Sequence, residues 1–200
     1  MVAVNLCSYS SIHPEPTANS STVQAQRVMI RPVEPQDLSS LAEILTQSFH
    51  PAEGWMAWTH PLLKLGIYED LRTRLGSKSP HYLCLVAIHG LDDVSGTVEM
   101  SLRSCSWTIQ NTHYPYISNL AVGENYRRQG IASKLLVSCE QVALRWGFRD
   151  LYLHVLENNQ QARRLYFECG YRLCRVESSY INLLLNRPRR LLMHKRITQT

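Results

Sequence analysis

The chain of 200 residues carries a net charge of +5 and is 44% hydrophobic and 18% charged. This length fits one domain with a core of ordinary size, and the composition excludes a fibre or a wholly disordered chain. No stretch approaches the roughly 18 consecutive apolar residues that cross a membrane, and a mildly basic charge suits an anionic ligand as well as nucleic acid.

Residues 1–26 differ in composition from the rest of the chain. They are rich in Ser, Thr and Pro and show no hydrophobic period, which predicts a disordered arm ahead of one domain over residues 27–200. A secretory signal would combine basic residues with an apolar run, and neither is present. The serine content and the single acidic residue, Glu15, leave a plastid transit segment open. We therefore expect a cytoplasmic protein, with the plastid stroma as the alternative.

Regular hydrophobic periods begin after Arg27 and predict alternating groups of strands and helices. In chain order these are a strand at 28–32, helices at 35–49 and 61–75, strands at 82–88, 97–102 and 116–122, a helix at 130–146, a strand at 151–156, a helix at 162–169, and strands at 171–176 and 191–197. The order β-α-α-β-β-β-α-β-α-β-β shows no internal repeat. It predicts a mixed sheet with helices on both faces.

The most informative segment, residues 120–133, passes from an apolar strand through a basic loop into a helix. The first turn of a helix has free backbone N–H groups and the positive end of the dipole, so it binds phosphate well. Gly130 has no side chain, which lets an anion approach the backbone closely, and Ala132 is nearly as small. Arg127 and Arg128 add positive charge at the same place. The segment predicts a phosphate cradle.

The place of this segment between a strand and a helix is more specific than its residue pattern. The pattern Arg/Gln-x-x-Gly-x-Gly/Ala alone occurs by chance in roughly one chain of this size in five. Its position between an apolar strand and an amphipathic helix is the stronger signal. The chain has no Gly-x-x-x-x-Gly-Lys-Ser/Thr, and it has no Gly-x-Gly-x-x-Gly after a strand, so neither a P-loop nor a dinucleotide fold is indicated.

A second motif follows about thirty residues later. Residues 155–171 read Val-Leu-Glu-Asn-Asn-Gln-Gln-Ala-Arg-Arg-Leu-Tyr-Phe-Glu-Cys-Gly-Tyr. Together with residues 120–133 they resemble the paired acetyl-CoA-binding motifs of the GNAT superfamily of N-acetyltransferases, and the resemblance extends over residues 28–197. The stretches 150–166 and 183–197 are most similar to cyanobacterial and plastid members. The plastid members are protein acetyltransferases with lysine and N-terminal activity.

The resemblance implies the α/β GNAT fold, in which a mixed central β-sheet is splayed into a V between helices on both faces. The strands ending near Val122 and Leu156 would lie side by side and admit acetyl-CoA as co-substrate. Their backbone and the loop after them would hold the pantetheine arm and the pyrophosphate, and no metal is expected. The expected cofactor-binding residues are Leu120, Val122, Arg127, Arg128, Gln129, Gly130, Ile131, Ala132, Ser133, Asn159 and Tyr166.

The catalytic residues are expected on both sides of the V. By resemblance, Tyr166 matches the general acid that protonates the leaving thiolate, and packing in the core is its alternative role. The general base is open, because neither position that carries a glutamate in family members has one here. His154 stands at one position and Tyr116 at the other. His154 has a suitable ordinary pKa of about 6.5, while Glu99 or a water chain are alternatives.

The expected acceptor is a protein or peptide amine. At pH 7 a lysine amine costs about 4–5 kcal/mol to deprotonate and an α-amine about 1 kcal/mol. A weak base therefore favours N-terminal amines over lysines. A small amine, such as a polyamine or arylalkylamine bound near Trp55 and Trp58, is the first alternative. A non-catalytic acyl-CoA sensor is the second.

Other classes of partner fit the sequence less well. Arg187, Arg189 and Arg190 lack interleaved aromatic residues and precede a predicted strand, so a nucleic-acid partner is not expected. None of the six cysteines forms a C-x-x-C pair, which argues against a zinc or redox motif and suits a reducing, intracellular setting. We expect no membrane partner and a monomer or homodimer.

Overall fold

The computed structural model describes residues 28–49, 59–77, 79–90, 92–104, 113–177 and 187–198. The predicted arm and most of the aromatic loop, with Trp55 and Trp58, lie outside these residues and stay predictions.

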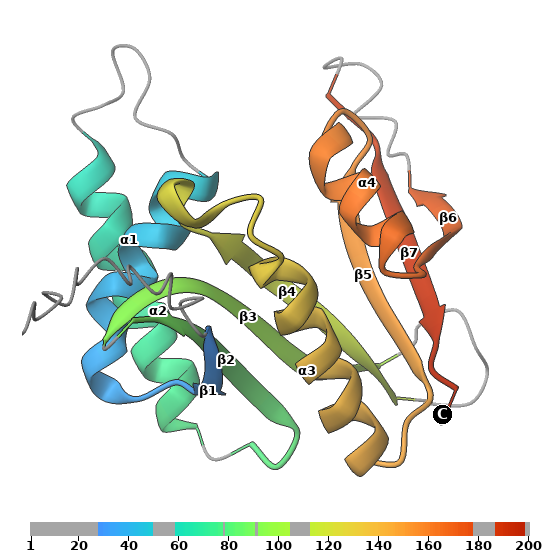
Figure 1. The fold of residues 1–200 in the computed structure, drawn as a ribbon, viewed down its shortest axis with the longest axis horizontal. Coiled ribbons are helices and arrows are strands. Elements are labelled where there is room, and N and C mark those ends of the chain that lie inside the picture. The colour runs from blue at the N-terminus through green and yellow to red at the C-terminus, as the bar shows by residue number, and fades with distance from the viewer. Residues whose placement is uncertain are drawn as a thin grey trace, which may run out of the picture.

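The predicted order of strands and helices is confirmed (Figure 1). The elements are β1 (Met29–Pro32), α1 (Leu38–Phe49), α2 (His60–Gly76), β2 (Tyr82–His89), β3 (Asp93–Ser104), β4 (His113–Val122), α3 (Ile131–Arg145), β5 (Asp150–Leu156), α4 (Gln160–Glu168), β6 (Arg172–Glu177) and β7 (Arg190–Arg196). Two of the strands, β3 and β4, begin earlier than predicted. Their first residues include Asp, Ser, Gly and Pro, which are uncommon in strands, and pairing with the neighbouring strand overrides that preference.

The sheet has seven strands in the order β1-β2-β3-β4-β5-β7-β6. All neighbours are antiparallel except β4 and β5, which are parallel and pair only at Tyr116–Tyr152 and Ile117–Leu153. Beyond this point β4 continues to Val122 and β5 to Leu156 without pairing to each other. The predicted splay of the sheet into a V is therefore confirmed, and the backbone of each strand is open to the gap.

The helices divide between the two faces of the sheet. Helices α3 and α4 share one apolar core with β4, β5 and β7. Helices α1 and α2 share a second core with β2 on the opposite face. Figure 1 shows that α1 and α2 cover only the β1–β4 half of the sheet. Among the described elements, no helix covers that face of β5, β7 and β6.

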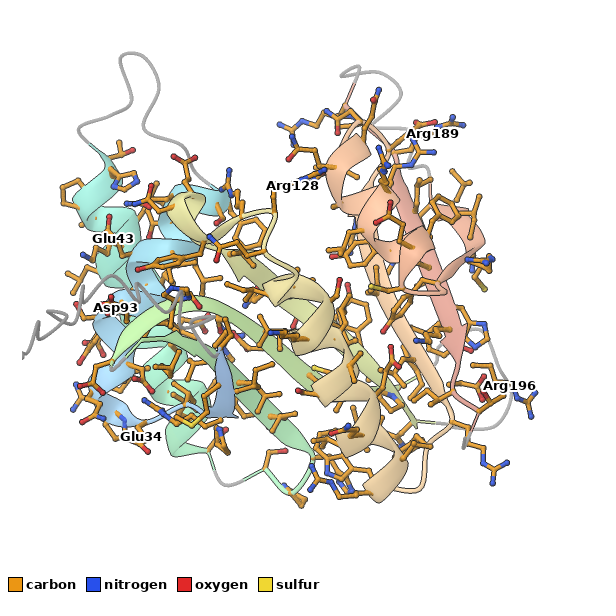
Figure 2. The ribbon with its side chains drawn as sticks, viewed as in Figure 1. Glu34, Glu43, Asp93, Arg128, Arg189 and Arg196 are labelled. Atoms are coloured by element: carbon orange, nitrogen blue, oxygen red, sulfur yellow. The ribbon has the colours of Figure 1, made fainter. Side chains whose placement is uncertain are left out.

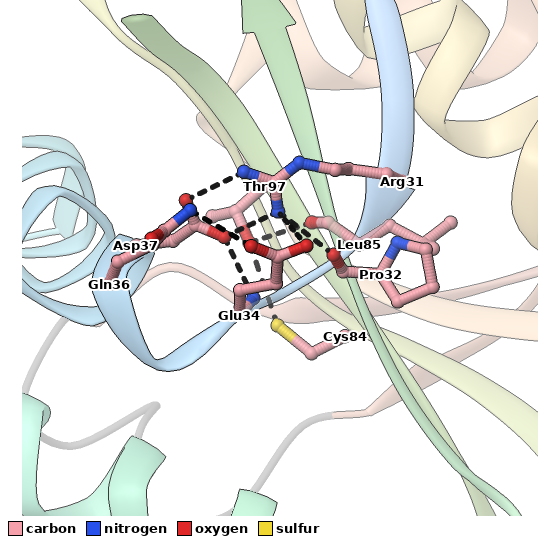
Figure 3. A network of polar contacts seen from close by, with 8 residues as sticks. All are labelled: Arg31, Pro32, Glu34, Gln36, Asp37, Cys84, Leu85 and Thr97. Carbon is pink, nitrogen blue, oxygen red and sulfur yellow. Dashed lines mark hydrogen bonds and ion pairs between the residues drawn. The ribbon is translucent and has the colours of Figure 1, made fainter. Parts of the chain in front are cut away.

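A partly buried ion pair fixes the start of α1 against the sheet (Figure 3). The Arg31 guanidinium donates to both oxygens of Asp37 at 2.7 and 3.0 Å, and the Glu34 amide donates to the same carboxylate at 2.8 Å. Burial opposes the charge of Asp37, but Arg31 and the Glu34 amide hold its pKa below the ordinary value. The corner therefore sets the direction of α1, whose last residues reach the candidate site.

None of the helices within the described ranges is both long and apolar enough to cross a membrane.

Candidate active site

A cleft of about 690 Å³ opens where β4 and β5 separate. It lies between the end of β4 and the start of α4, with residues of α3, α4 and the end of α1 in its lining. Its lining residues are Ser48, Phe49, Leu120, Ala121, Val122, Tyr126, Arg127, Arg128, Gly130, Ile131, Ala132, Ser133, Asn159, Gln161, Ala162, Arg164, Leu165, Tyr166 and Glu168. The two sequence motifs therefore face each other across one cavity.

The loop before α3 turns its backbone amides toward this cleft. Arg128 and Gly130 both have left-handed backbones, with φ of 66° and 76°. Such turns arrange successive N–H groups into a concave anion site. Gly130 is the N-cap of α3 and offers no capping side chain, and the first α-helical bond runs from the Lys134 amide to the Gly130 carbonyl at 3.1 Å. The first-turn amides of Ile131, Ala132 and Ser133 are thus left for a ligand.

Three arginines line the same cleft. The Arg127 side chain is held by the Val122 carbonyl at 3.1 Å, and Arg164 pairs with Glu168 at 2.8 Å. Arg128, labelled in Figure 2, lies on the loop before α3 and has no ion-pair partner among the described residues. Guanidinium groups and helix-start amides together form a site for phosphate groups.

On the α4 side, Asn159 and Tyr166 contribute polar groups. Asn159 is the N-cap of α4, and its side-chain oxygen accepts from the Ala162 amide at 3.0 Å. Tyr166 is 8% exposed and contacts Tyr171 edge-on, with ring centroids 6.0 Å apart. Burial, with smaller effects of Tyr116 and Cys169, raises the pKa of Tyr166 to about 12. Its hydroxyl therefore keeps its proton at neutral pH and can donate it inside the cleft.

His154 lies on the other face of the sheet. Leu153 and Val155 pack in the core with α3, so the alternation of β5 turns His154 away from it. The Tyr116 hydroxyl lies 2.9 Å from Nδ1 of His154, and a Glu177 carboxylate oxygen lies 3.0 Å from Nε2. Three strands thus bring Tyr116, His154 and Glu177 together beside the point where β4 and β5 last pair.

The electrostatic surroundings keep His154 neutral. Burial lowers the pKa of His154; Glu177 raises it, while Arg190 and Arg103 lower it, and the result is a pKa below the ordinary value. A carboxylate at Nε2 favours the tautomer with its proton on that nitrogen. Nδ1 then carries a lone pair that accepts a hydrogen bond from the Tyr116 hydroxyl. The three residues form a chain along which a proton can move.

Two of the predicted site residues lie outside the cleft lining. The Gln129 side chain donates to the Asn125 carbonyl at 3.3 Å instead of facing the cavity. His154 lies on the opposite face of the sheet, outside this cavity. All the other predicted cofactor-binding residues line the cleft.

The alternative base, Glu99, is held by other side chains. It is 2% exposed and accepts hydrogen bonds from Arg74, Tyr82 and Asn119 at 2.5, 2.9 and 2.8 Å. A carboxylate that already accepts three hydrogen bonds from the protein has little accepting capacity left for a substrate. This arrangement favours a structural role for Glu99, linking α2 to the sheet.

The sequence reasoning missed Glu177 and the end of α1. Ser48 and Phe49 reach the cleft from α1, and no motif marks them. Glu177 reaches His154 because β6 pairs with β7, which pairs with β5. That strand order is not visible in local sequence patterns.

Comparison with known proteins agrees with this geometry. The family model described as the acetyltransferase (GNAT) family matches residues 38–171. The chain belongs to the GNAT acetyltransferase family. Its sequence is 32% identical over 135 residues to GCN5-related N-acetyltransferase 10, chloroplastic, of Arabidopsis thaliana, which covers 61% of this chain and 52% of that protein. It is 26% identical to the uncharacterized N-acetyltransferase YycN of Bacillus subtilis, covering 72% of this chain and 92% of that one.

Solved structures share the GNAT fold. PaiA N-acetyltransferase from Thermoplasma acidophilum, in complex with coenzyme A, superposes with a TM-score of 0.65 at 18% identity, over 85% of this chain and 99% of that one. Arabidopsis thaliana NAA60 with a bisubstrate analogue gives 0.62 at 21% identity, over 87% and 100%. At these identities the likeness concerns the fold alone. The chain also spans only about half the length of the chloroplastic relative above.

Proposed function

We propose that this GNAT domain transfers the acetyl group of acetyl-CoA directly to a primary amine of a protein or peptide. One observation carries the proposal. A cleft that could hold phosphate groups opens where β4 and β5 separate, and a Tyr116–His154–Glu177 chain lies beside the last paired residues of these strands.

The residues of the cleft fit acetyl-CoA. The open amides of Ile131, Ala132 and Ser133 and the guanidinium of Arg128 would hold the phosphates. Past Ile117 the backbone of β4 has no partner strand on the β5 side, so Leu120 and Val122 would pair with the amide groups of the pantetheine arm. Acetyl-CoA would supply the activated acetyl group as a thioester.

The chain's own residues would move the protons. An attacking amine must be neutral, and a leaving thiolate must gain a proton. Tyr116 and His154 would accept the amine proton, with Glu177 holding the imidazole in the required tautomer. Tyr166 would donate to the thiolate, because its raised pKa keeps it protonated.

The low basicity of His154 supports N-terminal amines as preferred acceptors. A base with a pKa below 6.5 removes a proton from an α-amine near 7.7 much more easily than from a lysine near 10.4. The named relatives include chloroplastic proteins, which supports the plastid stroma over the predicted cytoplasm as the place of action.

The test is a pair of assays with acetyl-CoA. Peptides with one free α-amine or one free lysine are incubated with the full chain, and mass spectrometry counts the acetyl groups added. We expect transfer to peptides, with α-amines at least as reactive as lysines. Transfer only to free polyamines or arylalkylamines would contradict the proposal, and binding of acetyl-CoA without any transfer would support the sensor alternative.

A further inference from the structure

Two exposed arginines flank Tyr116 and His154 on the face of the sheet opposite α3 and α4. Arg103, at the end of β3, stacks on the Tyr116 ring with its guanidinium carbon 3.5 Å from the ring centroid. Arg190, at the start of β7, lies opposite Leu156 on β5 and opposite Glu177 on β6. Arg103 and Arg190 are both exposed. They approach the Tyr116–His154 pair from two different strands.

Neither arginine has a carboxylate partner among the described residues. The next residue in sequence, Arg189, is held by Glu157 at 2.7 Å. Glu177, which lies opposite Arg190 on β6, makes its ion-pair contact with His154. The surface beside the proposed base therefore carries two positive charges that the described part of the fold does not neutralise.

We infer that Arg103 and Arg190 select acceptors that carry a carboxylate side chain next to the reacting amine, such as peptides with Asp or Glu at the second residue. This inference rests on the proposed function and names its substrate class. A guanidinium binds a carboxylate through two parallel hydrogen bonds, which fixes orientation as well as charge. Two of them on separate strands would hold an acidic side chain while the amine faces Tyr116.

The same two charges act on the amine itself. A positive field disfavours the ammonium form and makes the neutral, reactive amine easier to reach. It also repels acceptors with several positive charges. Polyamines and lysine-rich termini are therefore poor substrates for this face, which separates the peptide acceptor from the small-amine alternative.

The experiment compares three peptides that differ only at the second residue, which is Glu, Gln or Lys. The wild-type chain should show the order Glu, Gln, Lys in kcat/KM, with each step about fivefold, the size expected for a partly exposed ion pair. The preference should shrink in high salt, because exposed charges are screened.

Variants then assign the preference to these residues. Arg103→Gln and Arg190→Gln should each reduce the Glu-over-Gln preference about twofold, and the double variant should abolish it, whereas the matched Arg→Lys variants should keep most of it. Arg190→Glu should make the Lys peptide the better substrate. Arg145→Gln, an exposed arginine on the last turn of α3, removes the same charge on the other face and should change nothing.

Two results would overturn the inference in distinguishable ways. Equal kcat/KM for the three peptides would contradict the acidic preference while leaving peptide acetylation intact. No transfer to any of them, with acetyl-CoA binding retained in calorimetry, would contradict the proposed function and the inference with it.

Discussion

On the α3–α4 side of the sheet, the proposed phosphate site uses backbone amides at the start of α3, after a left-handed Gly130. On the opposite side, the proposed reactive groups are the side chains of Tyr116, His154 and Glu177, which come from three strands. The first arrangement depends on a short continuous segment and tolerates varied side chains. The second arrangement consists of side chains that the strand order brings together. Changing one of these side chains therefore interrupts the chain. Mutations should therefore separate binding from turnover.

The largest expected effect is the loss of acetyl-CoA binding in Gly130→Glu. A side chain at φ 76° is strained, and its carboxylate would repel the phosphates. Losing two or more charge-assisted hydrogen bonds should weaken binding by more than about 100-fold in calorimetry.

Gly147→Glu is the matched control for this variant. Gly147 has φ 86°, lies just past the other end of α3, and has open space around it, as Gly130 does. Both variants should lose about 1–2 kcal/mol of stability to the left-handed backbone, and only Gly130→Glu should lose binding. An unchanged affinity in folded Gly130→Glu would place the phosphates elsewhere.

The second expected effect belongs to Tyr166→Phe, which should slow turnover about 10²–10⁴-fold and leave acetyl-CoA affinity nearly intact. The change removes only the hydroxyl, so the buried ring still packs against Tyr171.

Tyr171→Phe is the control, because the Tyr171 hydroxyl is buried without a hydrogen-bond partner in the described structure. Its removal should leave turnover unchanged and stability equal or slightly higher. Wild-type turnover in Tyr166→Phe would return Tyr166 to the core-packing role.

The third effect concerns pH and the opposite side of the sheet. Activity should fall as pH drops through the pKa of His154, which lies below 6.5 because of burial and the nearby Arg190 and Arg103, despite Glu177. Glu177→Gln removes the group that raises this pKa, so the acidic limb of kcat/KM should move to lower pH.

His154→Ala should abolish that limb and reduce lysine acetylation more than N-terminal acetylation, because the lysine amine needs the base more. The matched variant is His194→Ala, which changes a histidine paired with Asp150 at 2.7 Å on the same face and should keep the limb. A limb that survives in His154→Ala would assign the titration to another group.

Sequence reasoning named many of the residues that line the cleft but missed Glu177 on the other side, and the difference has a physical reason. A helix start with Gly130 and flanking arginines is a local feature, and its function depends on backbone geometry that the segment itself determines. The Tyr116–His154 contact joins residues 38 positions apart, and the Glu177 contact requires the β5-β7-β6 order. Periodicity identifies each strand but not its neighbours, so Glu177 could not be assigned to His154 from the sequence.

The smallest expected effect tests Asn159, a cleft residue that combines a structural contact with a proposed contact to the ligand. Asn159 caps α4 through its side-chain oxygen, which leaves its amide group for acetyl-CoA. Asn159→Ala should cost about 1 kcal/mol of stability, because the cap is lost. Asn159→Asp keeps the capping oxygen and suits the positive helix start, so its melting temperature should match that of the wild type. It lacks the amide donor and adds a negative charge near the phosphates, so acetyl-CoA affinity should fall about fivefold. If Asn159→Asp bound acetyl-CoA as tightly as the wild type, the residue would serve α4 alone, and the cofactor side would rest on the α3 loop and Tyr166.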